Sequence, residues 1–273
     1  MSAEGETKMI KLIVSDMDGT LLDDNKKLHD DFWEVFDELK KRGIYFVPAS
    51  GRQYFNIYEY FKKTKEGLII LAENGSFIVE NGKEIYSKCL DNKKVVEIIK
   101  DIRKIPSANP VFCGKKKGYI ENSFPELIKE IEKYYEKYEI VDDITKVDDE
   151  ALKIAICDLT GAEENLYPYV KKYNKDFKVT VSSFIWIDIT NKDIDKGKGL
   201  KILQEKLGIS KNETMVFGDY LNDYELMQQG KYSFAMENAH PELKKVAKYC
   251  GGDNNKGGVV NTIKRYVLQG EEL

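Results

Sequence analysis

The sequence predicts an α/β fold in which a doubly wound parallel sheet is interrupted by an inserted α+β domain. Two observations lead to this prediction. Short apolar runs alternate with amphipathic helical segments at both ends of the chain, whereas short strands follow one another directly in the middle. The length of 273 residues also exceeds the usual size of one domain. We therefore expect residues 1–86 and 189–273 to form a core and residues 87–188 to form the inserted domain.

The first part of the chain consists of strand–helix units. Apolar runs predict strands over residues 10–15, 44–49 and 68–72. Apolar residues at helical spacing predict the intervening helices, over residues 31–42 and 53–63. Units of this kind imply parallel strands with helices on both faces of the sheet. The Asn81-Gly82 pair that follows predicts a hairpin.

The order of elements changes after residue 87. Helices are expected over residues 93–103, 125–138 and 162–173. Strands are expected over residues 110–113, 119–121, 152–159, 179–182 and 184–188. Because short turns join neighbouring strands, we expect an antiparallel sheet with helices on one face.

The alternation of helix and strand returns at Lys196. Helices are predicted over residues 196–207, 223–228, 241–248 and 259–268, and strands over residues 215–217 and 233–235. The two outer segments each resemble half of one doubly wound domain. The middle domain is therefore expected to be an insertion.

Composition excludes several classes of protein. The net charge is −4, and lysines are mixed with acidic residues throughout, so no basic face for nucleic acid is expected. The four cysteines are scattered, which argues against a zinc ribbon or a disulfide framework. Residues 1–9 do not have the pattern of a signal peptide, and no apolar run has the length of a membrane span. We expect a cytoplasmic protein with no nucleic-acid or membrane partner, and no protein partner is implied.

The chain has only two histidines, His29 and His240. Both lie where helices are expected to begin, so we interpret them as helix-start residues. Chemistry at a site in this protein must then depend on carboxylates, lysines and hydroxyls.

Polar residues follow three predicted strands of the core, and ligands bind parallel sheets at the carboxyl ends of the strands. Asp16 and Asp18 follow the first strand. Ser50, Gly51 and Arg52 follow the second. Asp219, Asn222 and Asp223 follow the strand at 215–217, so all of these side chains are expected to converge on one crevice. Each motif alone is also typical of a turn or a helix start, and the prediction depends on their conjunction.

Converging carboxylates repel one another unless a cation neutralises them, and carboxylate oxygens favour Mg²⁺. Asp16 and Asp219 are the expected direct ligands, and Asp223 supports them. Asp16 is suited to attack phosphorus and form an aspartyl-phosphate. Asp18 can protonate the leaving oxygen and then activate water.

A phosphate group also needs a cation from the protein. Lys196 and Lys198 both lie at the expected start of a helix, where anions are favoured. We prefer Lys196, because Lys-Gly-x-Gly-Leu places it where the chain re-enters the core.

Four segments resemble the motifs of the haloacid dehalogenase superfamily. They are Asp16-Met17-Asp18-Gly19-Thr20, Ala49-Ser50-Gly51-Arg52, Lys196-Gly197 and Gly218-Asp219-Tyr220-Leu221-Asn222-Asp223. Glu73-Asn74-Gly75 and the segment from Ala235 to Ala239 look like its Cof-type branch, which has a large type IIB cap inserted between the second and third motifs. The chain looks closest to the bacterial sugar phosphatases of that branch.

The resemblance implies a Rossmann-like core and assigns roles by position. Asp16 would be the nucleophile and a metal ligand, and Asp18 would be the acid/base and hold the metal through its backbone carbonyl. Asp219 would be the third ligand. Ser50 with Gly51, Lys196 and Asn222 would hold the phosphate, and Asp223 would support the site. Ser50 replaces the commoner threonine of the family and keeps the hydroxyl.

The resemblance implies a Mg²⁺-dependent phosphatase for small phosphorylated metabolites, above all sugar phosphates. A phosphohexomutase that transfers phosphate within one substrate, and a non-catalytic metabolite-binding protein, remain as alternatives. The inserted domain is expected to cover the crevice. Candidate residues for its leaving-group pocket are Phe112, Cys113, Gly114, Lys116, Lys117, Tyr119, Ser182, Ser183 and Phe184. Phe112 is interpreted as core of this domain.

Overall fold

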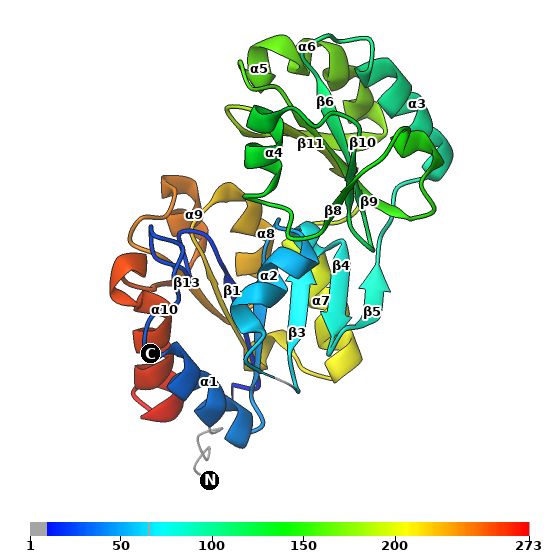
Figure 1. Cartoon of the computed structure of the whole chain (residues 1–273). Coiled ribbons are helices and arrows are strands. Elements are labelled where there is room, and N and C mark those ends of the chain that lie inside the picture. The colour runs from blue at the N-terminus through cyan, green and yellow to red at the C-terminus, as the bar shows by residue number, and fades with distance from the viewer. Residues whose placement is uncertain (1–9, 65, 273) are drawn as a thin grey trace.

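The computed structural model describes residues 10–64 and 66–272 and contains two separate β-sheets (Figure 1). An eight-stranded sheet forms the core domain, and a six-stranded sheet forms the cap domain. The segment that forms the cap leaves the core after β5 (Lys83–Ser87) and returns to it before α7 (Lys196–Leu207). The predicted α/β fold with an inserted α+β domain is confirmed. The prediction that residues 1–9 are not a signal peptide concerns residues outside the described part of the chain.

The core sheet is parallel except at one edge. Its strand order is β14-β13-β12-β1-β2-β3-β4-β5, and β4 and β5 are antiparallel. The parallel strands are β1 (Leu12–Asp16), β2 (Tyr45–Ala49), β3 (Ile69–Ala72), β12 (Thr214–Gly218), β13 (Tyr232–Ala235) and β14 (Tyr249–Cys250). Leu12–Asp16 is wholly buried, which explains the apolar run Leu12-Ile13-Val14 in the sequence of β1. β4 (Phe77–Glu80) and β5 form the predicted hairpin.

Helices cover both faces of the core sheet (Figure 1). One face carries α1 (Phe32–Lys41), α2 (Tyr54–Phe61) and α10 (Gly258–Ile263). The other carries α7, α8 (Tyr224–Gln228) and α9 (Pro241–Val246). The buried side of α1 consists of the four apolar residues at helical spacing that predicted it, Phe32, Val35, Phe36 and Leu39.

The cap sheet has the strand order β10-β11-β9-β6-β7-β8. Its strands are β6 (Asn109–Gly114), β7 (Gly118–Ile120), β8 (Tyr138–Ile140), β9 (Ala151–Cys157), β10 (Phe177–Ser183) and β11 (Trp186–Asn191). Its helices are α3 (Asn92–Ile102), α4 (Pro125–Ile131), α5 (Ala162–Asn165) and α6 (Tyr167–Val170). All neighbouring strands are antiparallel except β7 and β8, which are parallel.

The prediction that the cap helices lie on one face of the sheet is wrong. Side chains alternate between the two faces of β9, and Ile154 and Ile156 pack in the cluster that includes α3, α5 and α6. Ala155 and Cys157 point to the opposite face, where α4 packs. Because α4 is only 7 residues long, it covers only part of its face. The uncovered part of that face, including Lys153 of β9, lines a cavity against the core.

Two predicted cap helices are shorter than expected. The segment 125–138 is helical only to Ile131, and Tyr138–Ile140 pairs with β7 as an edge strand. The segment 162–173 breaks at Leu166, since Pro168 lies at the start of a second short helix. Phe184 lies in the turn between β10 and β11 rather than in a strand. The short edge strand β14 is not predicted by the sequence.

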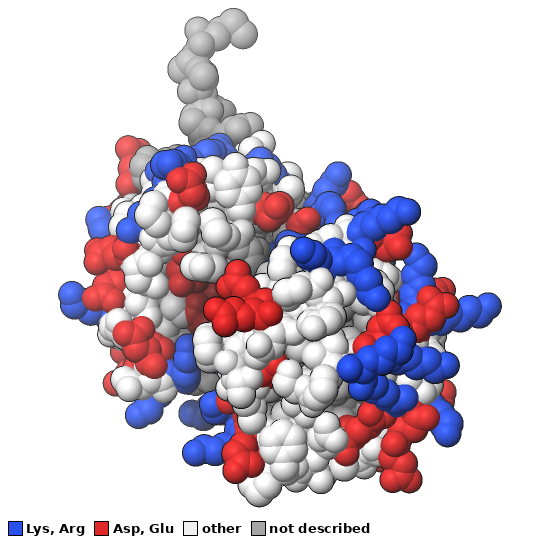
Figure 2. Space-filling model, turned by 90° about the horizontal axis from the view of Figure 1, so that it is seen from above, with Lys and Arg blue, Asp and Glu red and all other residues white. Residues whose placement is uncertain are grey.

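Within the described part of the chain, no helix is both long and apolar enough to span a membrane. The four cysteines are free thiols. On the face that Figure 2 shows, basic and acidic side chains are interspersed.

Candidate active site

The predicted site residues lie at the carboxyl ends of three neighbouring strands, β12, β1 and β2. Asp16 is the last residue of β1 and is paired in register with Ala49, the last residue of β2. Ser50, the next residue of the chain after Ala49, therefore lies close to Asp16. Asp219 follows the last residue of β12. Parallel pairing therefore brings these segments, far apart in the sequence, to one edge of the sheet.

Lys196 is the buried centre of this site. Its ammonium contacts Asp16 Oδ1 at 2.5 Å and Asp223 Oδ1 at 2.7 Å, and the side chain is fully buried. Burial lowers the pKa of Lys196, but the two carboxylates outweigh it and hold that pKa above its ordinary value. Lys198 is half exposed, and its ammonium lies 3.6 Å from Asp195 Oδ2. Of the two lysines considered from sequence, Lys196 is the one within the cluster of carboxylates.

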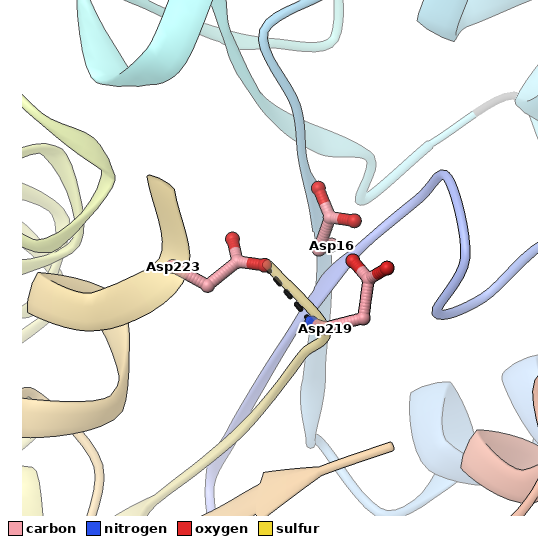
Figure 3. Close-up of side chains that lie close together, drawn as sticks. All are labelled: Asp16, Asp219 and Asp223. Carbon is pink, nitrogen blue, oxygen red and sulfur yellow. Dashed lines mark hydrogen bonds between the residues drawn. The ribbon is translucent and has the colours of Figure 1, made fainter. Parts of the chain in front are cut away.

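The carboxylates of Asp16, Asp219 and Asp223 converge (Figure 3), and those of Asp16 and Asp223 contact Lys196. One oxygen from each of Asp16, Asp219 and Asp223 lies within 4.8 Å of the other two. Burial, together with the neighbouring carboxylates, raises the pKa of Asp16 well above its ordinary value and that of Asp219 to about 6. When all three are ionised, one ammonium among three carboxylates leaves a net negative charge that a divalent cation could neutralise. An all-oxygen donor set suits Mg²⁺.

Asp223 holds the loop that carries Asp219. Its Oδ2 accepts a hydrogen bond from the backbone N–H of Asp219 at 3.1 Å (Figure 3). It also accepts one from the backbone N–H of Tyr220 at 3.3 Å. A Cβ atom at Gly218 would lie 2.6 Å from Cβ of Asp223, so this turn requires glycine. Asp223 therefore both pairs with Lys196 and fixes the backbone next to Asp219.

Asp219 is contacted from two other loops. Thr20 Oγ1 donates to Asp219 Oδ1 at 3.3 Å, and Asn238 Nδ2 lies 3.4 Å from Asp219 Oδ2. Asn238 also donates to the carbonyl of Gly19 at 2.8 Å. Gly19 has φ +72°, and a Cβ there would lie 2.3 Å from Asp219 Oδ2. The tight approach of these loops explains the glycine in the motif.

Asp18 is held by two cations. Arg52 donates to both of its carboxylate oxygens at 2.6 Å, and Lys26 contacts Oδ1 at 2.8 Å. Burial raises the pKa of Asp18, but the hydrogen bonds and charge of Arg52 and Lys26 outweigh it and leave that pKa below its ordinary value. Asp18 is therefore a carboxylate in this structure, facing the cavity above Asp16.

Ser50, Gly51 and Asn222 also line this cavity. Ser50 is buried, and its Oγ accepts a hydrogen bond from the backbone N–H of Arg52 at 3.2 Å. A Cβ at Gly51 would lie 2.9 Å from the side-chain amide of Asn74. Asn222 is exposed and donates to Asn74 Oδ1 at 3.4 Å. The structure thus brings all eight predicted site residues to one edge of the core sheet, with Lys196 and Asp223 beneath the others.

The cavity has a volume of about 380 Å³ and lies between the core and the cap. Its cap side is formed by residues of β9, of the turn before β8, and of the β10–β11 hairpin: Tyr134, Tyr135, Lys153, Ser182, Ser183, Trp186 and Asp188. Only two of the cap candidates from sequence, Ser182 and Ser183, line it. Phe112, Cys113 and Tyr119 are buried in the cap, in agreement with the interpretation of Phe112 as core.

The other charged or aromatic cap candidates are engaged elsewhere. Lys116 lies near Asp148, and Lys117 contacts Glu139 at 2.7 Å. Phe184 is 74% exposed and lies outside the cavity. His240 is the N-cap of α9, as expected for a helix-start residue.

Sequence reasoning placed Arg52 at the end of the second strand, after Ser50 and Gly51, but assigned it no role. It missed Gln53, Lys153 and Asp188 as cavity residues. No sequence pattern predicts that Lys153 and Asp188 line the cavity, since each is a single charged residue in an apolar strand. Their place in the cavity depends on strand register in the cap and on how the cap packs against the core.

Comparison with known proteins agrees with this geometry. The family profile described as "haloacid dehalogenase-like hydrolase" matches residues 13–263. The chain is 33% identical to the 5-amino-6-(5-phospho-D-ribitylamino)uracil phosphatase YbjI of Escherichia coli, over 94% of this chain and 96% of that protein. It is 28% identical to the 5-amino-6-(5-phospho-D-ribitylamino)uracil phosphatase YcsE of Bacillus subtilis, over 98% of this chain and 100% of that protein.

A solved structure shows the same fold. SMU.1108c from Streptococcus mutans superposes with a TM-score of 0.83 at 29% identity, over 95% of this chain and 99% of that one. The resemblance seen in the sequence motifs is therefore confirmed, and the match to this family profile agrees with the Cof-type branch. This chain belongs to the haloacid dehalogenase-like hydrolases and is related along nearly its whole length to phosphatases of that family.

Proposed function

We propose that this protein is a Mg²⁺-dependent phosphatase that hydrolyses phosphate monoesters of small metabolites through an aspartyl-phosphate on Asp16. The observation that carries the proposal is the contact of buried Lys196 with Asp16 and Asp223 beneath a cavity of about 380 Å³. A cavity of this size suits a small molecule rather than a polymer.

The metal would be held by Asp16 and Asp219, with the backbone carbonyl of Asp18 as a third ligand. Asp223 is better suited to support, because Lys196 and two backbone N–H groups already occupy its oxygens. When bound, Mg²⁺ would neutralise charge on the phosphate as an anionic nucleophile approaches.

The chain's own groups account for the two half-reactions. A carboxylate oxygen of Asp16 forms a bond to phosphorus, the bond from phosphorus to the leaving oxygen breaks, and Asp18 gives that oxygen a proton. Water then attacks the phosphoryl group, Asp18 takes its proton, and the Asp16 carboxylate is released. Lys196 holds Oδ1 of Asp16 in place throughout. Ser50, Gly51 and Asn222 lie where they can bind the phosphate oxygens.

Arg52 would exchange partners during this cycle. In the structure it holds Asp18 as a carboxylate, whereas the first half-reaction needs Asp18 protonated. An entering phosphate offers Arg52 a second anionic partner. Departure of Arg52 from Asp18 removes the interaction that lowers its pKa, so the proton is gained when substrate is present.

We infer that the substrate is a phosphorylated sugar or a related polyol. Hydroxyl and carboxylate groups on the cap side of the cavity, from Ser182, Ser183 and Asp188, support this. The names of two relatives favour a second candidate, a ribityl phosphate that carries a pyrimidine ring. The aromatic pair Tyr134 and Trp186, with ring centroids 6.0 Å apart, offers a surface for such a ring. We further propose that residues 87–188 act as the substrate-specificity domain.

Release of inorganic phosphate from a panel of sugar, polyol and nucleotide monophosphates tests the proposal. Activity should require Mg²⁺ and return when the metal is added back after chelation. Asp16→Asn should reduce kcat by at least about a thousandfold with unchanged circular dichroism. Activity that survives in Asp16→Asn within a few-fold would rule out the nucleophile. Formation of an isomeric sugar phosphate without free phosphate would favour the mutase alternative.

A further inference from the structure

The cap side of the cavity carries one cation and one carboxylate. Among its lining residues in the described chain, only Lys153 and Asp188 carry charge. They lie on adjacent strands, β9 and β11, on the same face of the cap sheet, and the Lys153 ammonium is 4.0 Å from Asp188 Oδ1. The remaining lining groups on this side are two serines and three aromatic residues.

The charge of Lys153 is already balanced. Its ammonium contacts Glu73 of the core at 2.9 Å and donates to the carbonyl of Gly51 at 3.1 Å, and the side chain is 9% exposed. Burial lowers the pKa of Lys153, but Asp188 and Glu73 outweigh it and keep that pKa above its ordinary value. Lys153 is therefore a cation that faces two carboxylates and a carbonyl, and it has no surplus charge to attract another anion.

Nearby cations of the cap are also engaged. Lys133 pairs with Glu130, Lys137 lies over the ring of Phe55, and Lys115 contacts Glu84 and Glu150. None of these three lysines lines the cavity. An anionic group entering from the cap side would meet the Asp188 carboxylate without an unpaired cation to offset it.

The hydrogen-bonding groups that remain suit a neutral ligand. Asp188 accepts hydrogen bonds, and the hydroxyl of Ser183 can donate and accept. The hydroxyl of Ser182 donates to the carbonyl of Trp186 at 3.3 Å and can still accept. The indole N–H of Trp186 is occupied by Glu130 at 3.2 Å, and Tyr135 OH lies 3.1 Å from Cys113 Sγ. Trp186 and Tyr135 therefore present mainly apolar surface, while Asp188 favours groups with O–H or N–H donors.

We propose that Lys153, Asp188, Ser182 and Ser183 form a leaving-group subsite that selects uncharged, hydroxyl- or N–H-rich leaving groups and rejects anionic ones. The inference rests on the proposed phosphatase function and narrows its substrate class. Monophosphates of neutral sugars, polyols or polyol-substituted heterocycles are accepted. Sugar bisphosphates, phosphorylated sugar acids and nucleoside diphosphates are discriminated against, because a second anion would lie against Asp188.

A matched pair of ligands tests this selectivity. Glucitol 6-phosphate and 6-phosphogluconate differ only at carbon 1, which carries a hydroxyl in one and a carboxylate in the other. Each is measured as a substrate and as a competitor of acetyl phosphate hydrolysis, so that a compound that binds without turnover still yields an inhibition constant. The wild-type protein should prefer the neutral compound by about tenfold or more, as expected for a like-charge contact in a partly buried site.

The Asp188→Asn variant removes the repelling charge and keeps the shape. It should reduce the preference to about threefold or less, mainly by improving binding of 6-phosphogluconate. Asp148→Asn makes the same change at a fully exposed cap residue and should leave the preference unchanged. Equal binding of the two ligands by wild type, no competition by glucitol 6-phosphate, or an unchanged preference in Asp188→Asn would overturn the subsite.

Acetyl phosphate separates this inference from the function on which it rests, because its leaving group is too small to report on the cap. Hydrolysis of acetyl phosphate by wild type without discrimination between the two ligands would overturn the subsite alone. Absence of acetyl phosphate hydrolysis in the presence of Mg²⁺ would overturn the phosphatase proposal itself.

Discussion

The guanidinium of Arg52 forms two hydrogen bonds of 2.6 Å with the carboxylate of Asp18. Arg52 is also held by Asn56 Oδ1 at 2.7 Å, so its position is determined by helix α2 as well as by Asp18. The pair links the loop after β1 to the loop after β2. It places a cation at the wall of the cavity, within the set of residues that would surround the phosphate.

Replacement of Arg52 by methionine should lower kcat/KM by about a hundredfold, a loss typical of removing one oriented donor from a charged transition state. Steady-state phosphate release measures it. Lys26→Met is the matched control, because Lys26 contacts the same carboxylate but is 53% exposed, and it should cost no more than about threefold. Equal losses in both variants would contradict a specific role for Arg52.

Lys196 should contribute to stability as well as to chemistry. Lys196→Met leaves Asp16 and Asp223 buried without their cation, which is expected to cost about 3–5 kcal/mol in the free energy of unfolding. Urea denaturation in the absence of metal measures this loss. Lys198→Met, two residues away at a half-exposed position, should change stability by less than about 0.5 kcal/mol. A small effect at Lys196 would mean that the carboxylates are not dependent on it.

Magnesium should stabilise the fold more at neutral than at acidic pH. The raised pKa values of Asp16 and Asp219 mean that the folded protein without metal binds protons more tightly than the unfolded chain. The stability from these protons is fully present below the ordinary value of 3.8 and is lost as pH rises through about 6 for Asp219. Excess MgCl₂ should therefore raise Tm by several degrees near pH 7.5 and by little near pH 5. Equal shifts at both pH values would contradict a site made of these carboxylates.

Gln53 should hold the cap against the core. Its side-chain amide donates to the carbonyl of Lys137 at 3.0 Å and accepts from the N–H of Lys137 at 3.3 Å. Gln53→Ala removes both bonds, so exchange of the Lys137 amide hydrogen should accelerate by about tenfold. Gln228→Ala, at an exposed position of α8, is the control and should leave that exchange rate unchanged. Unaltered protection of Lys137 in Gln53→Ala would show that other contacts hold the cap.

The amino-acid sequence alone was enough to predict the core and its carboxylates. Strands such as Leu12–Asp16 are buried on both faces and appear as apolar runs, and Asp16, Ser50 and Asp219 follow such runs directly. Their convergence follows from a general property of parallel sheets, whose strands end at one edge. The elements of the cap were harder to predict from the sequence. The helix expected over residues 125–138 ends early because its last residues approach a strand that pairs with β7, and the helix expected over 162–173 is interrupted before Pro168.

Only the tertiary structure revealed the other wall of the cavity. Lys153 and Asp188 are single charged residues within apolar strands, and nothing local distinguishes them from solvent-exposed residues of an edge strand. Strand register places both on one face of the cap sheet, and α4 leaves that part of the face open. Packing of the cap against Gly51 and Glu73 then buries Lys153 beside the carboxylates that balance it. Motifs at strand ends are local and can be read from the sequence, whereas charge balance across two domains arises only when the domains pack together.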